Sequence, residues 1–200
     1  MSRLRVLQYN VQKSKDKVMA PLLADQAVAL YDVLALQEPW KNPHKNATYC
    51  PNSSAFYVAY NDQERRSCFL INKSLDVNSW DVDYLGPDVC SLRLQLPDIV
   101  LWIHNFYSQP PGSYTTTNYP SSLLHLPELL AREGEHLVLG DFNLHHPLWC
   151  GPRNPATHQA ADRVVETLLL RDMELATPQG MITWEARDSV STINLAFVSQ

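Results

Sequence analysis

Short runs rich in β-branched and aromatic residues recur along nearly the whole chain, and this repetition constrains the fold more than any other feature of the sequence. Such runs have the length and composition of strands. A further segment alternates apolar Cys90, Leu92, Leu94 and Leu96 with polar residues, which indicates a strand with one buried face. The other predicted strands are residues 4–9, 33–37, 55–60, 68–71, 99–106, 136–139, 181–184 and 192–198.

Helical spacing of apolar residues is found in only a few stretches, residues 18–30, 121–132 and 156–171. The last is the clearest, because its apolar positions form an i, i+4 stripe made of Val164, Val165, Leu168 and Leu169. Pro21 and Pro127 lie inside the other two patterns. We therefore expect those two helices to begin late, to bend, or to be short.

Few helices among many strands, without strict alternation, favour an α+β sandwich of two sheets flanked by helices over a doubly wound parallel sheet. The chain has 200 residues, of which 45% are hydrophobic, enough for one ordinary core. We expect one domain over residues 1–200. The stretch 108–122, rich in Pro, Ser, Thr and Tyr, is predicted to be a long surface loop that borders a site.

The net charge of −5 argues against a broad surface that coats DNA, because non-specific affinity comes largely from basic side chains. A nuclease is not excluded, since a metal ion can supply positive charge at a phosphate. The four cysteines show no close spacing and are expected to be reduced. No apolar run is long enough for a signal peptide or a membrane span, so we expect an intracellular protein with no membrane partner.

Polar side chains directly follow several of the predicted strands, at the points where the strands end. Because one rim of a sheet collects such residues, we expect them to line one cleft. They are Asn10, Glu38, Tyr107 and the pair formed by Asp141 and Asn143.

These residue types suit the hydrolysis of a phosphate ester. Glu38 is a hard oxygen ligand for Mg²⁺ or Mn²⁺, and Asn10 and Gln12 could add neutral oxygens. Asp141 is the candidate base for an attacking water, which the hydrolysis of a phosphodiester requires. If the turn is extended, Asn143 faces the same side and can hold that water or a phosphate oxygen, while Tyr107 would donate its hydroxyl to phosphate.

Each residue also has a plainer interpretation. A lone Glu or Tyr at a strand end is usually solvated, with roughly one chance in ten of being catalytic. The segment 140–143 could be an ordinary Asx turn. His145 and His146 are adjacent and lack zinc-ligand spacing. Trp40 and Trp149 are by default packing residues, although an aromatic ring on a loop can also stack on a base.

Taken together and in order, the polar segments resemble the endonuclease/exonuclease/phosphatase family over almost the whole chain. The segments are 9–11, 36–40, 105–107 and 140–144. Within this resemblance, segments 37–40, 143–149 and 191–195 are similar to the endonuclease domains of non-LTR retrotransposons.

The resemblance implies a four-layered α/β sandwich, Mg²⁺ (or Mn²⁺) dependence, and nicking of one DNA strand to expose a 3′ hydroxyl that primes reverse transcription. It also implies a reverse transcriptase domain in a longer parent protein and, if the chain is the product of a eukaryotic retroelement, nuclear localisation. By the matching motifs, Glu38 is the metal ligand with Asn10 beside it, and Tyr107 is a phosphate contact. Asp141 and Asn143 activate and position the water, and Gln12 and His145 are expected to contact substrate.

Two departures from the family pattern affect the expected activity. Asn194 stands where relatives usually have an Asp that supports the histidine of a later Ser-Asp-His motif, and the sequence ends at Gln200 without that motif. An amide carries no charge to favour an imidazolium, and in another hydrolase the analogous change costs roughly 10⁴ in rate. We therefore expect a domain that is incomplete at its C-terminus and lacks its final strand.

Two rival functions remain open at this point. One is a catalytically impaired remnant of such a nuclease, for which Asn194 is the argument. The other is a phosphomonoesterase or lipid phosphodiesterase on the same scaffold, because a fold does not fix a substrate.

Overall fold

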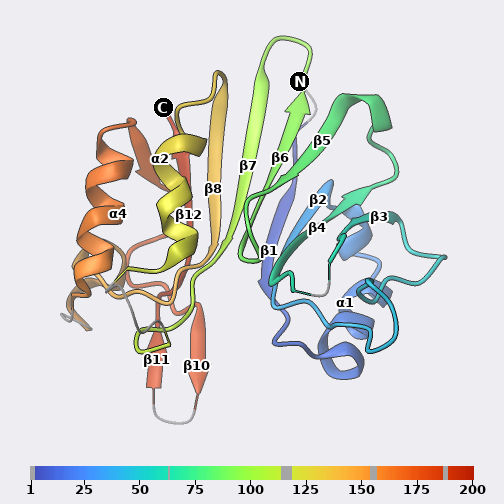
Figure 1. The fold of residues 1–200 in the computed structure, drawn as a ribbon, viewed down its shortest axis with the longest axis horizontal. Helices are drawn as coiled ribbons and strands as arrows, with labels where there is room; N and C mark the ends of the chain where they lie inside the picture. The colour runs from blue at the N-terminus through green and yellow to red at the C-terminus, as the bar shows by residue number, and fades with distance from the viewer. Residues whose placement is uncertain (1–2, 63, 114–118, 154–156, 187–188) are drawn as a thin grey trace.

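The computed structural model describes residues 3–62, 64–113, 119–153, 157–186 and 189–200. They form two mixed sheets packed face to face (Figure 1). The smaller sheet has the order β1-β2-β4-β3, and only β1 and β2 are parallel. Its strands are β1 (Val6–Asn10), β2 (Val33–Gln37), β3 (Phe56–Ala59) and β4 (Ser67–Asn72).

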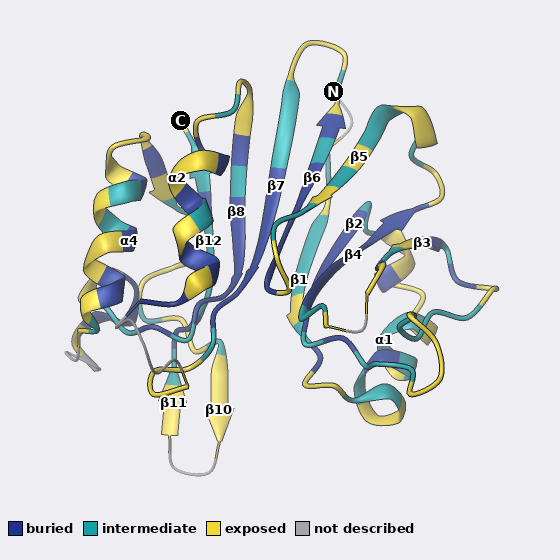
Figure 2. Ribbon diagram, viewed as in Figure 1, coloured by how far each residue is buried: buried dark blue, intermediate teal, exposed yellow. Residues whose placement is uncertain are grey.

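The larger sheet has the order β5-β6-β7-β8-β12-β9, in which only β7 and β8 are parallel. Its strands are β5 (Trp80–Tyr84), β6 (Val89–Gln95), β7 (Val100–Tyr107), β8 (Glu135–Asp141), β9 (Met173–Leu175) and β12 (Asn194–Ser199). A separate exposed pair, β10 (Trp184–Ala186) and β11 (Ser189–Ser191), projects from one end of the sandwich (Figures 1 and 2).

Three apolar clusters stack from one side of the molecule to the other. The middle cluster lies between the sheets, where Phe69 and Ile71 of β4 face Leu92 and Ile103 of the larger sheet. The outer clusters lie between each sheet and its helices, as the dark inner faces in Figure 2 show. The result is helix, sheet, sheet, helix, which confirms the predicted four-layered sandwich.

Proline divides two of the predicted helices, as expected. Residues 18–30 contain part of a π-helical turn (Lys15–Met19), then α1 (Ala20–Ala24) and a 3₁₀ turn (Val28–Leu30). Residues 121–132 contain a 3₁₀ turn (Ser121–His125) and α2 (Leu126–Leu129). In both α-helices proline lies in the first turn, where its missing N–H costs nothing.

The helix predicted over 156–171 is α4 (Gln159–Leu169), and residue 156 lies outside the described residues. Val164 and Leu168 are buried against the larger sheet, but Leu169 is 68% exposed, so the predicted stripe is wrong at that position. The short turns α3 (Pro147–Cys150), 151–153 and Val77–Ser79 were not predicted.

Most predicted strands are present within one or two residues, with some exceptions. Only Trp184 of the segment 181–184 is in a strand. Strands β5, β9 and β11 carry no long apolar run and were missed. In β6 both faces are largely buried, because Ser91 on the second face lies under His104 of β7. A strand in the middle of a layered sandwich need not have a solvated face.

The four cysteines are free thiols. Among the helices of the described residues, none has the length and apolar character needed to cross a membrane.

Candidate active site

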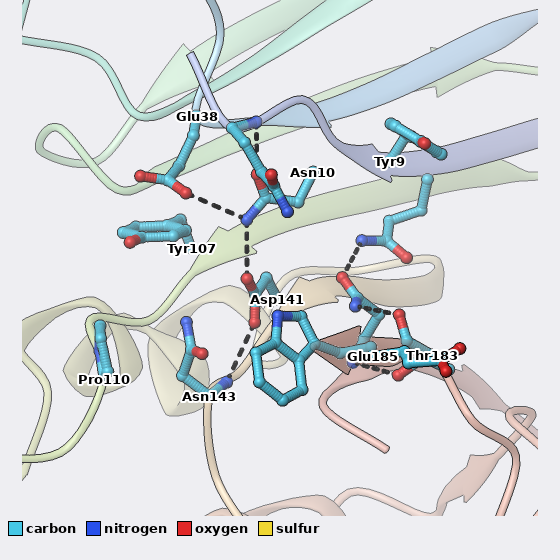
Figure 3. A pocket seen from close by; sticks show the side chains of 13 residues that line it. Tyr9, Asn10, Glu38, Tyr107, Pro110, Asp141, Asn143, Thr183 and Glu185 are labelled. Carbon is cyan, nitrogen blue, oxygen red and sulfur yellow. Dashed lines mark hydrogen bonds between the residues drawn. The ribbon is translucent and has the colours of Figure 1, made fainter. Parts of the chain in front are cut away.

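The register of the two sheets brings the predicted site residues to one rim. In the larger sheet, Tyr107 of β7 pairs with Asp141 of β8, and Asp141 pairs with Asn194 of β12. In the smaller sheet, Asn10 at the end of β1 pairs with Gln37 at the end of β2, and Glu38 follows directly. Each sheet therefore supplies part of the same cleft (Figure 3).

The close approach of β7 and β8 at this rim depends on Gly140. A Cβ atom at this position would lie 1.9 Å from the carbonyl oxygen of Phe106, and the residue has φ 148°. Only glycine permits that backbone and that contact. The glycine that precedes Asp141 therefore allows its carboxylate to lie beside Tyr107.

A cavity of about 440 Å³ lies at the rim. It is lined by all the predicted site residues except His145. The predicted lining residues are Asn10, Gln12, Glu38, Tyr107, Asp141, Asn143 and Asn194.

Asn10 joins the two carboxylates of the cavity. Its Nδ2 donates to Asp141 Oδ2 at 2.7 Å and to Glu38 Oε2 at 3.3 Å, as drawn in Figure 3. Its Oδ1 accepts the backbone N–H of Gln12 at 2.9 Å. One amide thus connects the smaller sheet to the larger one and keeps two acidic groups within reach of a single ligand.

Glu38 lies in a strained and well-supported backbone position. It has φ 47°, a left-handed conformation that non-glycine residues rarely adopt. Its N–H donates to the carbonyl of Arg66 at 2.7 Å, and its carbonyl accepts the N–H of Lys13 at 2.7 Å. The Lys13 ammonium lies 3.3 Å from Glu38 Oε1. Strain of this kind, held by neighbouring bonds, is typical of functional positions.

Asp141 is 5% exposed, and burial raises the pKa of its carboxyl to about 6. The hydrogen bonds from Asn10 and Asn143 oppose that rise, and the nearby Glu38 adds to it. A carboxyl with this pKa is mostly ionised at neutral pH and is a better proton acceptor than an ordinary aspartate. This is the property that a base for water activation needs.

Tyr107 remains a hydroxyl donor. Burial raises its pKa first, and the negative charges of Glu38 and Asp141 raise it further, together with a hydrogen bond to Glu38. Ionisation beside two carboxylates is unfavourable, so the phenol keeps its proton. It can donate that proton in a hydrogen bond to an anionic oxygen.

Asn143 lies in an Asx turn, the plainer interpretation of segment 140–143, and its side chain also lines the cavity. Its N–H donates to Asp141 Oδ1 at 3.2 Å, which is the local bond of an Asx turn. It adopts φ 49°, and its Nδ2 donates to the carbonyl of Ser108 at 2.8 Å. The turn places the Asn143 side chain on the cavity wall beside Asp141.

Asn194 is held by an amide network that the sequence did not reveal. Its Oδ1 accepts from Gln8 Nε2 at 2.8 Å, and its Nδ2 donates to the carbonyl of Thr183 at 3.1 Å. Gln8 Nε2 also donates to Gln37 Oε1 at 2.6 Å, and Gln37 Nε2 donates to Asn105 Oδ1 at 2.5 Å. The chain of amides runs from the larger sheet to the smaller one and back, and two of its members, Gln8 and Asn194, line the cavity.

His145 lies outside the main cavity. It lines an adjacent hollow of about 790 Å³ that shares Pro110, Asn143 and Trp184 with the first. Its Nε2 lies 2.8 Å from Ser191 Oγ, and its ring stacks on His158. Burial lowers the pKa of the imidazole, and the neighbouring His158 lowers it further. His145 therefore lies outside the main cavity, and Asn143 is the predicted site residue that borders both hollows.

Several lining residues were missed by sequence reasoning. Gln8 had a usable signal, because residues two apart in a strand share a face and Asn10 was already a candidate. Tyr9, Pro110 and the segment 183–185 had no such signal. Pro110 lies in the loop after β7 and residues 183–185 lie in the β10 segment, whose positions the local sequence does not determine, whereas Tyr9 belongs to β1.

The side chains of the cavity suit a hard divalent cation such as Mg²⁺ better than a metal ion that needs several protein ligands around it. Within the described residues, no group of three or more His, Cys, Asp or Glu side chains is gathered to hold an ion. Mg²⁺ needs only one or two carboxylates and otherwise keeps water and substrate phosphate. Glu38 is the available carboxylate, and its oxygens already attract the positive charge of Lys13 and the N–H of Asn10. A cation of that kind fits this site.

A comparison with protein families finds a match over half of the chain. The family model described as "Endonuclease-reverse transcriptase" matches residues 101–200. No curated protein matches the chain.

Many solved structures share the fold. The endonuclease domain of TRAS1, a telomere-specific non-LTR retrotransposon, is similar with a TM-score of 0.62 and 15% identity, over 99% of this chain and 86% of that one. An AP endonuclease from Leishmania major gives 0.69 and 16%, over 98% and 79%. D. rerio TDP2, complexed with a single-strand DNA product, gives 0.58 and 12%, over 100% and 84%.

Proposed function

We propose, because the chain belongs to the endonuclease-reverse transcriptase family, that its cavity hydrolyses phosphodiester bonds of DNA and nicks one strand. The observation that carries the proposal is the Asn10 amide, which joins Glu38 and Asp141 from opposite sheets in one polar cavity. The two carboxylates and the Tyr107 hydroxyl are the groups that hydrolysis of a phosphodiester requires.

A divalent metal ion, Mg²⁺ or Mn²⁺, would be held by Glu38, with Asn10 beside it. When bound, such an ion polarises a phosphoryl oxygen and offsets negative charge. The net charge of the chain is −5, so positive charge supplied locally at the site would matter more here than in a basic protein.

The other side chains of the site have separate roles in the reaction. Asp141 accepts the proton of the attacking water, for which its raised pKa suits it. Asn143 holds that water or a phosphate oxygen from the adjacent wall. The Tyr107 hydroxyl donates a hydrogen bond to a phosphate oxygen and so stabilises the negative charge that develops on that oxygen in the transition state. Gln12 contributes a polar contact to substrate, and His145 acts on a more distant part of it from the neighbouring hollow.

The partners of this reaction follow from the family. We propose DNA as the substrate and a reverse transcriptase domain in the parent protein, so that the nick exposes a 3′ hydroxyl as a primer. Action on chromosomal DNA requires a nuclear location in a eukaryotic host.

A specific observation favours a second candidate, an impaired remnant of such a nuclease. Asn194 has no charge, and both ends of its amide are engaged by Gln8 and Thr183. This arrangement leaves no carboxylate at that position to support a cationic histidine. A remnant would keep the cavity and bind metal, but it would nick slowly.

Nicking of supercoiled plasmid in Mg²⁺ tests the proposal. We expect the chain to convert supercoiled to open-circular DNA, and we expect Asp141→Asn to lower the rate at least roughly a hundredfold, because the amide cannot accept a proton. Asp98→Asn, an exposed carboxylate in the loop between β6 and β7, is the matched control and should leave the rate unchanged.

Equal, slow rates for the original chain and Asp141→Asn would favour the remnant. Hydrolysis of phosphomonoesters or phospholipids without nicking would overturn DNA as the substrate.

A further inference from the structure

The side chains of Arg66 and Asp88 form a partly buried ion pair beside Tyr107 of the cavity. Arg66 Nε lies 2.5 Å from Asp88 Oδ1, and Arg66 Nη2 donates to Oδ2 at 2.6 Å. Asp88 is only 3% exposed. Burial raises the pKa of its carboxyl, and the guanidinium beside it opposes the rise. The contact from Nη2 to Oδ2 is the hydrogen bond of the pair, whereas the buried Oδ1 accepts no hydrogen bond from the described residues and is held by charge alone.

The backbones of the same two residues hold the two halves of the cavity. The carbonyl of Arg66 accepts the N–H of Glu38 at 2.7 Å, on the side of the smaller sheet. The carbonyl of Asp88 accepts the N–H of Tyr107 at 2.8 Å, on the side of the larger sheet. The ion pair therefore links the backbone that supports Glu38 to the backbone that supports Tyr107.

The guanidinium also contacts the Tyr107 ring directly. Its central carbon lies 5.5 Å from the ring centroid, within cation–π range. With the amide of Gln109 turned to satisfy its partners, the Gln109 oxygen accepts from Nη1 at 2.7 Å and Nη2 at 2.5 Å. The guanidinium is thus engaged by protein acceptors and an aromatic ring, which favours a supporting role over direct binding of phosphate.

We propose that Arg66 and Asp88 are positioning residues that fix Tyr107 relative to Glu38 across the two sheets. This inference rests on the proposed function, because it assigns the pair to the same cavity. Displacement of a catalytic group by about 1 Å can cost roughly a hundredfold in rate. A link between the sheets would prevent such a displacement.

The test uses Arg66→Lys, which keeps the charge but loses the guanidinium with its bond to Oδ2 and its contact with the Tyr107 ring, and Asp88→Asn, which keeps the shape but loses the charge. Arg65→Lys is the matched control, because Arg65 lies over the Tyr84 ring and donates to the carbonyl of Gly86. Nicking kcat and KM, Mn²⁺ affinity by electron paramagnetic resonance, and melting temperature are measured for each. Every variant is also made with Tyr107→Phe.

We expect Arg66→Lys and Asp88→Asn to lower kcat roughly tenfold to a hundredfold, with KM within about twofold. Mn²⁺ affinity should fall about threefold or more, because the backbone that supports Glu38 shifts. At saturating Mn²⁺, which offsets the weaker metal binding, either change combined with Tyr107→Phe should lower kcat by no more than about twofold further, because the hydroxyl being positioned is already absent. Arg65→Lys should leave kcat and Mn²⁺ affinity within about twofold.

A raised KM with unchanged kcat would overturn the inference, because it would make Arg66 a phosphate contact. A lowered melting temperature with unchanged kcat and Mn²⁺ affinity would also overturn it. If Asp88→Asn does not fold, Arg66→Lys decides. Absence of nicking by the original chain, with Mn²⁺ binding that Arg66→Lys weakens, would overturn the nuclease proposal and leave the positioning role standing.

Discussion

Asn194 combines a donor and an acceptor in one small amide, and its surroundings use both. Gln8 donates to its oxygen, and the carbonyl of Thr183 accepts from its nitrogen. A carboxylate at this position could satisfy Gln8, but it would place a second acceptor against the Thr183 carbonyl. An aspartate is therefore a poor fit to these neighbours.

We predict that Asn194→Asp destabilises the folded chain by about 1 kcal/mol, the cost of leaving a partly buried acceptor without its donor. Urea unfolding at pH 7 measures the difference. The control is Asn52→Asp on an exposed turn, which should change the free energy of unfolding by less than about 0.5 kcal/mol. An Asn194→Asp chain as stable as the original would show that the network tolerates a carboxylate.

At the scale of elements, three neighbouring strands of the larger sheet share a buried polar chain. Ser91 Oγ of β6 lies 2.6 Å from His104 Nδ1 of β7, and His104 Nε2 lies 3.0 Å from His136 Nδ1 of β8. Burial lowers the pKa of His104 well below 6.5, and the neighbouring His136 lowers it further. Burial also lowers the pKa of His136.

These histidines make stability depend on pH. In the unfolded chain they take up protons near pH 6.5, whereas the folded chain holds them neutral, so stability is retained above that pH and lost as the pH falls below it. We predict that His104→Gln reduces the slope of unfolding free energy against pH between pH 5 and 6.5 by up to about 1.4 kcal/mol per unit. Exposed His44→Gln is the control. An unchanged slope in His104→Gln would mean that other groups govern acid sensitivity.

The strands and their ends also show how much of the fold and of the cavity could be predicted from the sequence. Runs such as Val33–Gln37 identified strands. Polar residues after strand ends identified part of the cavity wall, because strand ends collect at a rim, and these residues are Asn10, Glu38, Tyr107, Asp141 and Asn143. The contribution of Thr183 could not be predicted. Gln8 could be placed on the same strand face as Asn10, but its bond to Asn194 could not be foreseen. Both depend on the register of β12 against β8 and on the position of the β10 segment, which arise from pairing between distant parts of the chain.

At the scale of the whole molecule, the acidic net charge limits how the chain meets DNA. Each phosphate neutralised by a basic side chain adds about 0.9 to the steepness of the salt dependence of binding. A chain with net charge −5 has little basic surface to spare.

We therefore predict a shallow dependence, with log affinity for duplex DNA falling by less than about 3 per tenfold rise in salt. Fluorescence anisotropy with a labelled duplex in Ca²⁺ measures it without cleavage. A slope of about 6 or steeper would reveal an extended basic surface and contradict the prediction.

The contacts that close the cavity also determine when in folding it can form. The bond between Asn10 and Asp141 joins positions 131 apart, and that between Gln8 and Asn194 joins positions 186 apart. Loops of that length are costly to close, so contacts between distant positions form slowly. We therefore expect the cavity to form late in folding. A partly folded chain with most of its strands in place would still have no binding site.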